Sequence, residues 1–141
     1  ILGFSFTKIA SDKNLKFKHS STSTNIEFTD IQTRNVEFLK DSDALEVIFK
    51  YTITYTSAEK NKEEKQGEIL FEGGILLSTS KEEAKDISKS WKKKKLPPNF
   101  QVPLFNIILK KCTPKALYLA DELGLPSPIP LPQIKPQDAQ N

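Results

Sequence analysis

The stretch that decides the fold reads LEVIFKYTITYT at residues 45–56. Its residues alternate between apolar and polar, so one face of an extended chain is apolar and the other is charged or hydroxylated. The apolar face consists of Leu45, Val47, Phe49, Tyr51, Ile53 and Tyr55, and Ile48 alone breaks the alternation. This pattern predicts a long antiparallel strand with one face on a core and the other in water.

A second long strand is expected to begin at Gly67 and to pair with the first as a hairpin. Its inward face would carry Ile69, Phe71, Gly73, Ile75 and Leu77. The charged residues 57–66 predict a solvated connection between the two strands. Glycines in the middle of a strand, here Gly73 and Gly74, indicate a bulge, a sharp bend or another backbone close by.

Two shorter strands are predicted before this hairpin, at residues 4–9 and 26–28, where the same alternation recurs. Residues 20–25 contain only Ser, Thr and Asn, whose side chains bond their own backbone in turns, and they are predicted to form a linker. A second irregular segment is expected at residues 40–43.

A first helix is predicted to follow the sheet. Ser80 and Glu83 form a capping box, in which the hydroxyl accepts from the backbone of Glu83 and the carboxylate reaches back. Lysines 92–95 suit the negative end of the helix dipole, and Pro97 and Pro98 stop the helix. The apolar stripe of Ala84, Ile87 and Trp91 is narrow, enough to lay the helix on a surface without burying it.

A second, long and unusually apolar helix is predicted from near Pro103 to a cap at Gly124. Pro114 lies inside it and either kinks the helix or restarts it with Thr113 as cap. The segment carries more apolar surface than one small sheet covers, so part of it is expected to meet another copy or a client protein. Residues 125–141 form a proline-rich arm, expected to pack along its own domain because its prolines lack the spacing that SH3-type grooves bind.

Length and composition predict a single domain over residues 1–141 that needs no disulfide or metal to fold. Arg34 is the only arginine among 21 basic residues, and nucleic-acid recognition draws on arginine's planar fork. Residues 91–95, Trp followed by four lysines, are the sole nucleic-acid candidate. We interpret these lysines as serving the helix end and Trp91 as a core residue, and we expect no nucleic-acid partner.

Residues that would carry catalysis or hold a metal are few. His19 is the only histidine and Cys112 the only cysteine, too few for a ligand cluster. Cys112 lies on the apolar helix, where free cysteine behaves as a small hydrophobe rather than as a nucleophile. Acidic pairs such as Asp121 and Glu122 fall in loops or at charged helix ends, where solvation or capping explains them. We therefore expect no enzyme, no metal and no cofactor.

Hydropathy and cysteine usage bear on location. No run approaches the roughly 18 apolar residues that a membrane span needs. A lone cysteine without an intrachain partner indicates a reducing compartment, so we expect a cytoplasmic protein without a membrane span.

Taken in order, the two alternating strands, the Gly-Gly pair, the first helix and the long second helix resemble the SecB family of protein-export chaperones. The resemblance covers roughly residues 25–134. Its sharpest parts are Glu72-Gly73-Gly74-Ile75, the Pro98-Asn99 step followed by Phe105, and the Leu131-Pro132 ending. It implies an α+β fold in which a four-stranded antiparallel sheet packs with two helices and the chains assemble as a dimer of dimers.

The resemblance also implies an ATP-independent holding chaperone that binds unfolded or pre-secretory proteins in long apolar grooves. Candidate client-binding residues are Phe49, Tyr51, Tyr55, Phe71, Phe100, Phe105 and Tyr118, although a buried core uses the same residue types. Ile48, Leu70 and Leu76 fall on the nominally wet face of the sheet. With Trp91 they are candidates for the interface of a homodimer or homotetramer.

One departure from the family bears on partners. Members that pass clients to the SecA motor carry acidic residues ahead of the Gly-Gly, and alignment on Gly73 puts Ile69 at such a position, between Glu68 and Glu72. The acidic, metal-binding C-terminal tail of some members is also absent from this sequence. We therefore expect client holding more readily than a motor partner. The alternative is a non-catalytic interaction domain dedicated to one partner, such as an antitoxin.

Overall fold

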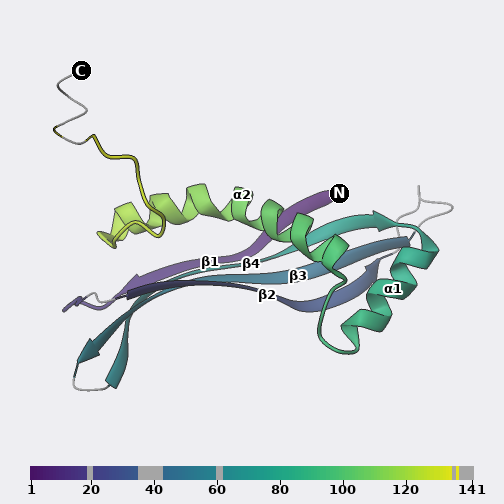
Figure 1. Ribbon diagram of the computed structural model, residues 1–141, viewed down its shortest axis with the longest axis horizontal. Helices are drawn as coiled ribbons and strands as arrows, with labels where there is room; N and C mark the ends of the chain where they lie inside the picture. Colours follow the sequence, from purple (N-terminus) through teal and green to yellow (C-terminus); the bar gives the residue numbers. More distant parts are fainter. Residues whose placement is uncertain (19–20, 35–42, 60–61, 135, 137–141) are drawn as a thin grey trace.

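The computed structural model describes residues 1–18, 21–34, 43–59, 62–134 and 136 of the 141-residue chain. Its elements are β1 (Gly3–Lys13), β2 (Ser21–Arg34), β3 (Asp43–Glu59), β4 (Lys62–Thr79), α1 (Lys81–Trp91) and α2 (Pro98–Leu123). The strands form one long, twisted antiparallel sheet in the order β1-β4-β3-β2, so β1 and β2 are its edges (Figure 1). The predicted α+β layout, a four-stranded antiparallel sheet with two helices of which the second is long, is confirmed.

The alternation along β3 and β4 gives the sheet two different faces. The strand register puts Phe49 of β3 opposite Phe28 of β2 and Gly73 of β4, and all three belong to one face. On this face the side chains of Val47, Phe49, Ile53, Ile69 and Phe71 are fully buried beneath the helices. We call it the helix-covered face and the other the open face.

Both edge strands contain a bulge at the same point of a similar sequence. In β1 the register shifts between Phe6 and Lys8, and in β2 it shifts between Phe28 and Asp30. In each bulge the extra residue is a threonine that follows a phenylalanine, Thr7 in β1 and Thr29 in β2, and it returns the next isoleucine, Ile31 in β2, to the helix-covered face. The edge strands are therefore longer than predicted, because a slip in the alternation hid their continuation.

The predicted linker at residues 20–25 is wrong, because residues 21–25 lie inside β2. The register pairs them with the hydroxyl-rich end of β3, and the side-chain oxygens of Ser21 and Thr56 are 2.7 Å apart. Pairing with a neighbouring strand outweighs the local turn preference of Ser, Thr and Asn. Of the irregular segment predicted at 40–43, residues 40–42 lie outside the described chain and Asp43 begins β3.

The solvated connection predicted at residues 57–66 is also shorter than expected. Strand β3 continues to Glu59 and β4 begins at Lys62, so the ladder runs through most of the charged segment, and residues 60 and 61 lie outside the described chain. A register shift beyond Tyr55 adds one residue to β4. Gln66 is buried there and accepts a hydrogen bond from the backbone N–H of Lys18 at 3.2 Å.

Of the three alternatives predicted for the Gly-Gly pair, the structure shows another backbone close by. A Cβ on Gly73 would lie 2.3 Å from the carbonyl oxygen of Ser5 in β1 and 3.0 Å from the ring of Phe49. Because β1 passes so near, only a residue without a side chain fits this position.

The capping box that begins α1 is confirmed. The hydroxyl of Ser80 accepts a hydrogen bond from the N–H of Glu83 at 3.1 Å, and the N–H of Ser80 donates to the Glu83 carboxylate at 3.1 Å. The helix ends at Trp91, with Lys92 as its cap, so the prolines lie beyond its end. Ala84 and Ile87 are buried, whereas Trp91 is half-buried.

Helix α2 begins at Pro98 rather than near Pro103, and Pro114 does not split it. Pro98 occupies the first turn, where its missing N–H costs nothing. Pro103 and Pro114 both lie on exposed parts of the helix, so the carbonyl that each leaves unpaired can bind water. The cap predicted at Gly124 is confirmed, with φ of 67°.

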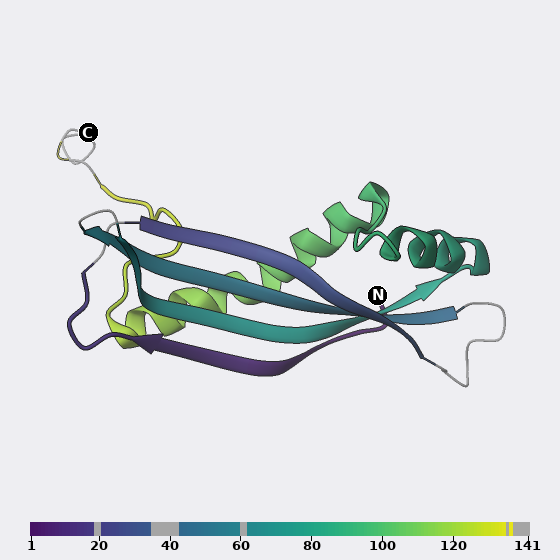
Figure 2. The same cartoon turned by 90° about the horizontal axis from the view of Figure 1, so that it is seen from below.

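The burial pattern of α2 repeats every fourth residue. A buried ridge consists of Leu104, Ile108, Cys112, Ala116 and Ala120. The row opposite the ridge is exposed throughout and consists of Val102, Asn106, Lys110, Pro114 and Tyr118. Because four residues are slightly more than one turn, the ridge winds slowly around the helix, and α2 crosses the strands obliquely (Figure 2).

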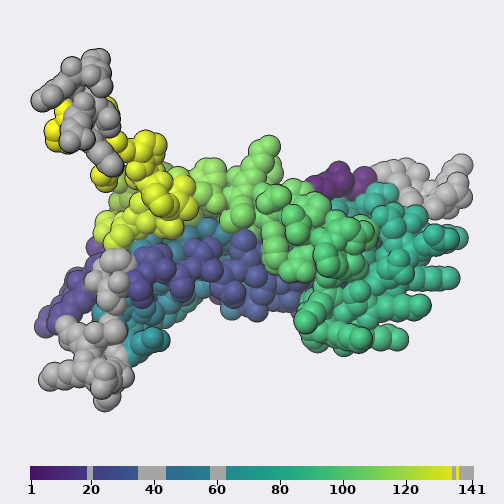
Figure 3. All heavy atoms as spheres, viewed as in Figure 1, coloured from purple at the N-terminus to yellow at the C-terminus, as the bar shows by residue number. Residues whose placement is uncertain are grey.

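In the part of the C-terminal arm that the structure describes, residues 125–134 and 136, the start packs against the domain. Leu125 is buried, and the hydroxyl of Tyr55 donates a hydrogen bond to the carbonyl of Pro126 at 2.6 Å. Beyond this point Leu131 and Ile134 are 55% and 83% exposed. The arm and α1 lie at opposite ends of the molecule (Figure 3).

Candidate functional site

One helix is narrower than four strands, so α2 leaves part of each edge strand uncovered on the helix-covered face. We call the strip of surface between α2 and β1 the β1-side trough and the strip between α2 and β2 the β2-side trough. The first has Phe4 and Phe6 on its strand, and the second has Ile26 and Phe28. All four side chains are half-buried and pack against the core.

The β1-side trough has an aromatic floor under lysine side chains. The rings of Phe4 and Phe6 meet edge to face with their centroids 5.1 Å apart. The ammonium nitrogen of Lys111 lies 6.0 Å from the centre of Phe4, and that of Lys115 lies 5.6 Å from the centre of Phe6. Lysines placed in this way cover an aromatic surface with their stems and keep their charge in water.

The trough ends near the N-terminus in a small hollow of about 140 Å³. Phe100, Leu104 and Ile107 of α2 line it together with Ile1, which is 65% exposed. The predicted client-binding residue Phe100 therefore lies at a surface hollow.

The β2-side trough is built on a stacked aromatic pair. The rings of Phe28 and Phe105 lie 4.9 Å apart at an angle of 9°. The adjoining hollow has a volume of about 510 Å³ and is lined by Ile26, Glu27, Phe28, Lys94, Lys95, Leu96, Gln101 and Phe105. One turn further along α2, Leu109 is 40% exposed. Like its counterpart, this trough combines an apolar floor with lysines at its rim.

Each trough is bordered by the edge of the sheet. Among the described strands, β1 pairs only with β4 and β2 pairs only with β3. The outer N–H and C=O groups of an edge strand are available to another extended chain. Each trough thus offers apolar side chains and a backbone edge side by side.

The seven predicted client-binding residues divide into two sets. Phe49, Tyr51, Tyr55 and Phe71 lie in the core with at most 2% of their surface exposed, and they support the packing of α2 on the sheet. Phe100 and Phe105 are half-buried and border the troughs, whereas Tyr118 is 63% exposed on the row opposite the ridge. The sequence did not identify three further aromatic residues of the troughs, Phe4, Phe6 and Phe28, as candidate client-binding residues.

The thiol of Cys112 lies in the buried ridge of α2. Burial raises the pKa of this thiol from 9.0 to about 12, so it stays protonated at neutral pH. Burial also raises the pKa of Tyr51, although its hydrogen bond with Thr113 opposes the shift. His19, the only histidine in the sequence, lies outside the described residues.

Within the part of the chain that the structure describes, no three His, Cys, Asp or Glu side chains gather closely enough to hold a metal ion. Neither of the helices in this part has the length and apolar character needed to cross a membrane.

The open face carries most of the predicted interface residues. Ile48, Leu70 and Leu76 all lie there, with Leu70 only 8% exposed between its neighbouring strands. Trp91 lies elsewhere, at the end of α1, where the ammonium of Lys94 is 5.2 Å from the centre of its ring. Ile69, aligned with an acidic position of the SecB family, is buried on the helix-covered face.

A row of alternating charge crosses the open face. The register places Lys8 of β1, Glu72 of β4, Lys50 of β3 and Glu27 of β2 next to one another in that order. Opposite charges on neighbouring strands attract, so the row stabilises the pairing of all four strands.

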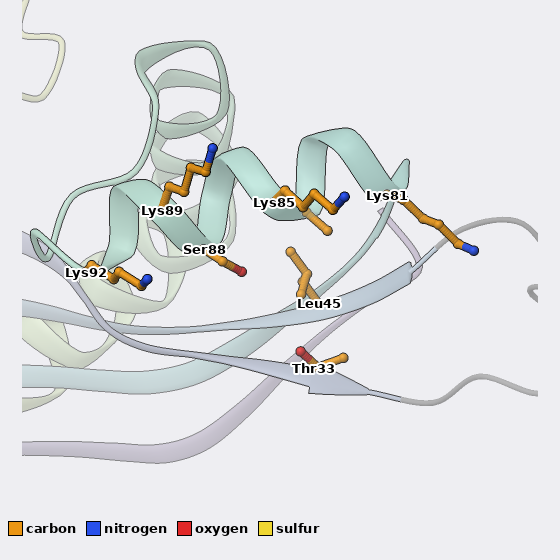
Figure 4. Close-up of a pocket in the computed structure, with 8 residues that line it drawn as sticks. Thr33, Leu45, Lys81, Lys85, Ser88, Lys89 and Lys92 are labelled. Carbon is orange, nitrogen blue, oxygen red and sulfur yellow. The ribbon is translucent and has the colours of Figure 1, made fainter.

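A third surface lies between α1 and the ends of β2 and β3 (Figure 4). This lysine groove has a volume of about 400 Å³ and is lined by Thr33, Leu45, Lys81, Ala84, Lys85, Ser88, Lys89 and Lys92. Leu45 and Thr33 extend from the strands toward α1, and Ser88 extends from α1 toward them. Leu45 and Ala84 are buried, whereas the four lysines are exposed.

Comparison with family models, curated proteins and solved structures gave no match for this chain.

Proposed function

We propose that the chain is a cytoplasmic, ATP-independent holding chaperone of SecB-like type, which binds unfolded or precursor proteins along the two troughs beside α2. The observation that carries this proposal is the pairing of an aromatic trough with an open strand edge on both sides of the helix. The sequence resemblance to the SecB family supports the same function.

The geometry suits an extended polypeptide of varied sequence. Its apolar side chains would contact the phenylalanine rings of a trough, such as Phe28 and Phe105, and its backbone would hydrogen-bond the edge of β1 or β2. Main-chain bonds give affinity without regard to sequence, and lysine stems at the rim adapt to different side chains. A folded client keeps most of its apolar side chains and backbone hydrogen-bonding groups inside, so it would bind far less than the unfolded form.

The test uses variants at exposed positions of the two troughs. Ile9 on β1 is 49% exposed and Leu109 on α2 is 40% exposed, so serine at both positions removes apolar surface with little change to the core. The matched control is Val102→Ser, which removes a 57% exposed apolar side chain from the row opposite the ridge. Light scattering during dilution of a chemically unfolded client measures holding.

We expect the wild-type chain and Val102→Ser to delay aggregation of the unfolded client, and Ile9→Ser/Leu109→Ser to delay it far less. Circular dichroism confirms that each variant keeps its fold. A wild-type chain that does not delay aggregation contradicts the proposal, and so does equal loss of holding in Val102→Ser.

We also propose that copies of the chain associate through the open face, as the predicted homo-oligomer requires. The charged row is complementary to itself. A two-fold axis running along the strands between β3 and β4 would place Lys8 over the partner's Glu27 and Glu72 over the partner's Lys50. The apolar side chains of Ile48 and Leu76 would then lie between the two sheets.

Sedimentation velocity tests this association with a charge swap. We expect an oligomer for the wild-type chain, dissociation by Lys50→Glu, and recovery in Lys50→Glu/Glu72→Lys, because position 72 then again faces an opposite charge at position 50 across the interface. A monomeric wild type, or an oligomer that is indifferent to Lys50→Glu, contradicts it.

A chaperone dedicated to one partner would use the same troughs, and the exposed apolar end of the arm favours such a fixed contact. Leu131 and the end of α2 line a further hollow of about 340 Å³. A panel of unrelated unfolded clients separates the two functions, because a dedicated chaperone should ignore generic unfolded proteins.

A further inference from the structure

The lysine groove differs in chemistry from the troughs and lies at the opposite end of the molecule from the arm (Figures 3 and 4). The groove lies between α1 on one side and the strand residues Thr33 and Leu45 on the other. Its floor is apolar, because Leu45 and Ala84 are buried there at 2% and 8% exposure. Four lysines stand around this floor.

The lysines of α1 that line the groove share one side of the helix. Lysines 81, 85, 89 and 92 recur at spacings of three and four residues, next to the buried stripe. The acidic residues Glu82 and Asp86 lie beyond these lysines, farther from the buried stripe, and Glu83 is engaged in the capping box. Among the described side chains, none of the four groove lysines lies within ion-pair distance of a carboxylate. The described ion pairs join Arg34 to Glu46 and Lys65 to Glu68.

We infer that the lysine groove docks an acidic, extended peptide segment of a partner protein. In an extended chain successive side chains point to opposite sides, so a segment that alternates acidic and apolar residues turns its apolar side chains to the floor. Its carboxylates then lie at the rim, within reach of the lysines. The eleven steps along the chain from Lys81 to Lys92 span about 16 Å of helix, and about five extended residues cover that length.

The groove fits an acidic peptide better than a nucleic acid. It has no arginine fork to pair with phosphates or bases, and its lining includes no aromatic ring on which a base could stack. Trp91, the nearest aromatic in sequence, is half-buried and lies under Lys94. A buried leucine at the floor contributes nothing to a nucleic-acid backbone, whereas it suits the apolar side chain of a peptide.

Fluorescence anisotropy tests the inference with a labelled peptide of about eight residues in which glutamate alternates with leucine and alanine. A second peptide carries glutamine in place of every glutamate. The variant Lys85→Glu/Lys89→Glu reverses charge at two exposed groove positions. The matched control Lys16→Glu/Lys110→Glu makes the same change in net charge at exposed positions outside the groove. A third variant, Ser88→Phe, fills the groove without altering its charge.

At low ionic strength we expect the acidic peptide to bind about tenfold more tightly than the glutamine peptide, with affinity that falls as salt screens the lysines. Lys85→Glu/Lys89→Glu and Ser88→Phe should each weaken binding about tenfold, and the control should stay within about twofold of wild type. Holding of unfolded clients should be unchanged in Lys85→Glu/Lys89→Glu, which separates this inference from the proposed chaperone function.

Several results would overturn the inference. Equal losses in the control variant would make the effect one of net charge rather than of the groove. Tighter binding of a polyuridylate oligomer, lost in Lys85→Glu/Lys89→Glu, would assign the groove to nucleic acid. A change in the oligomeric state of the chain alone in the same variant would show that a second copy occupies it.

Discussion

Helices α1 and α2 pack on the same sheet, but the surfaces beside them differ in chemical character. Helix α1 buries Ala84 and Ile87 and borders a groove rimmed by lysines. Helix α2 buries five residues in a ridge and is flanked by phenylalanine rings on both sides. The buried stripe attaches each helix to the sheet, whereas the residues beside the stripe decide which chemistry remains at the surface.

This difference gives the molecule two regions whose surfaces suit different kinds of ligand. The α2 region offers apolar side chains and open strand edges, which suit unfolded polypeptide. The α1 region offers positive charge over a small apolar floor, which suits an acidic segment. Because the two surfaces are built on different helices, one can be altered while the other is kept.

The largest expected effect comes from shortening a side chain in the α2 ridge. Ile108 is fully buried, so Ile108→Ala should lower the free energy of unfolding by about 3 kcal/mol through the lost burial and the cavity left behind. Urea denaturation followed by circular dichroism measures this change. The matched variant is Ile87→Ala in α1, which removes the same atoms from an equally buried site.

We expect α1 to unfold locally in Ile87→Ala, because only two of its residues, Ala84 and Ile87, are buried against the sheet. Hydrogen exchange should show early loss of protection in α1 while β3 and α2 remain protected. If α1 in this variant exchanged only by global unfolding, the two helices would be parts of one cooperative unit and the comparison would fail.

A smaller effect is expected from adding a methyl group at the close approach between β1 and β4. Gly73→Ala puts a methyl group against the Ser5 carbonyl, so β1 must shift, and the free energy of unfolding should fall by about 2 kcal/mol. Gly3→Ala is the control, because the nearest atom to its new methyl group lies 4.0 Å away. Equal melting temperatures for the two variants would contradict the close approach of β1.

The ridge should also give the stability of the chain a dependence on alkaline pH. Because the pKa of Cys112 is raised to about 12, the unfolded chain loses the thiol proton at lower pH than the folded chain. The free energy of unfolding should therefore fall as pH rises above about 9, by up to about 1.4 kcal/mol per pH unit. The raised pKa values of Tyr51 and Tyr55 add a fall in the same direction at higher pH.

The control for this titration is Cys112→Ala, which lacks the thiol. Between about pH 9 and pH 10 its free energy of unfolding should change less with pH than that of the wild-type chain. Parallel curves for the two proteins would show that the thiol does not titrate differently on unfolding.

The smallest effect concerns the start of α1. Ser80→Ala removes the hydroxyl that accepts from the Glu83 N–H and should cost about 1 kcal/mol. Hydrogen exchange in the first turn of α1 measures this loss, and the α2 region should not respond. Faster exchange throughout α2 would show that the cap supports more than its own helix.

The core strands and both helix caps were predictable because their signals are local. Burial alternates along residues 45–56 of β3, as the sequence pattern predicts. The Ser80 capping box and the Gly124 cap involve residues close in sequence. The start of α2 was misplaced because Pro98 and Pro103 both suit a first helical turn. Burial of Leu104 and Ile108 on one ridge, a tertiary effect, extends the helix through both internal prolines.

The troughs were only partly predictable. Phe105 was identified, but Phe28, on which it stacks, belongs to an edge strand whose length was hidden by the bulge before Asp30. Aromatic type alone did not separate core from surface, since Phe49 and Phe105 look alike in sequence. Their difference depends on strand order, which places β3 at the centre of the sheet and β2 at its edge.

Native mass spectrometry of the chain mixed with a chemically unfolded, slowly refolding client tests the holding function most directly, with the same client in its native form as control. The proposed function predicts a complex with the unfolded client alone, kept in Lys85→Glu/Lys89→Glu and depleted in Ile9→Ser/Leu109→Ser. A chain that captures neither form of the client, or captures both equally, would contradict the assignment of the troughs to unfolded proteins.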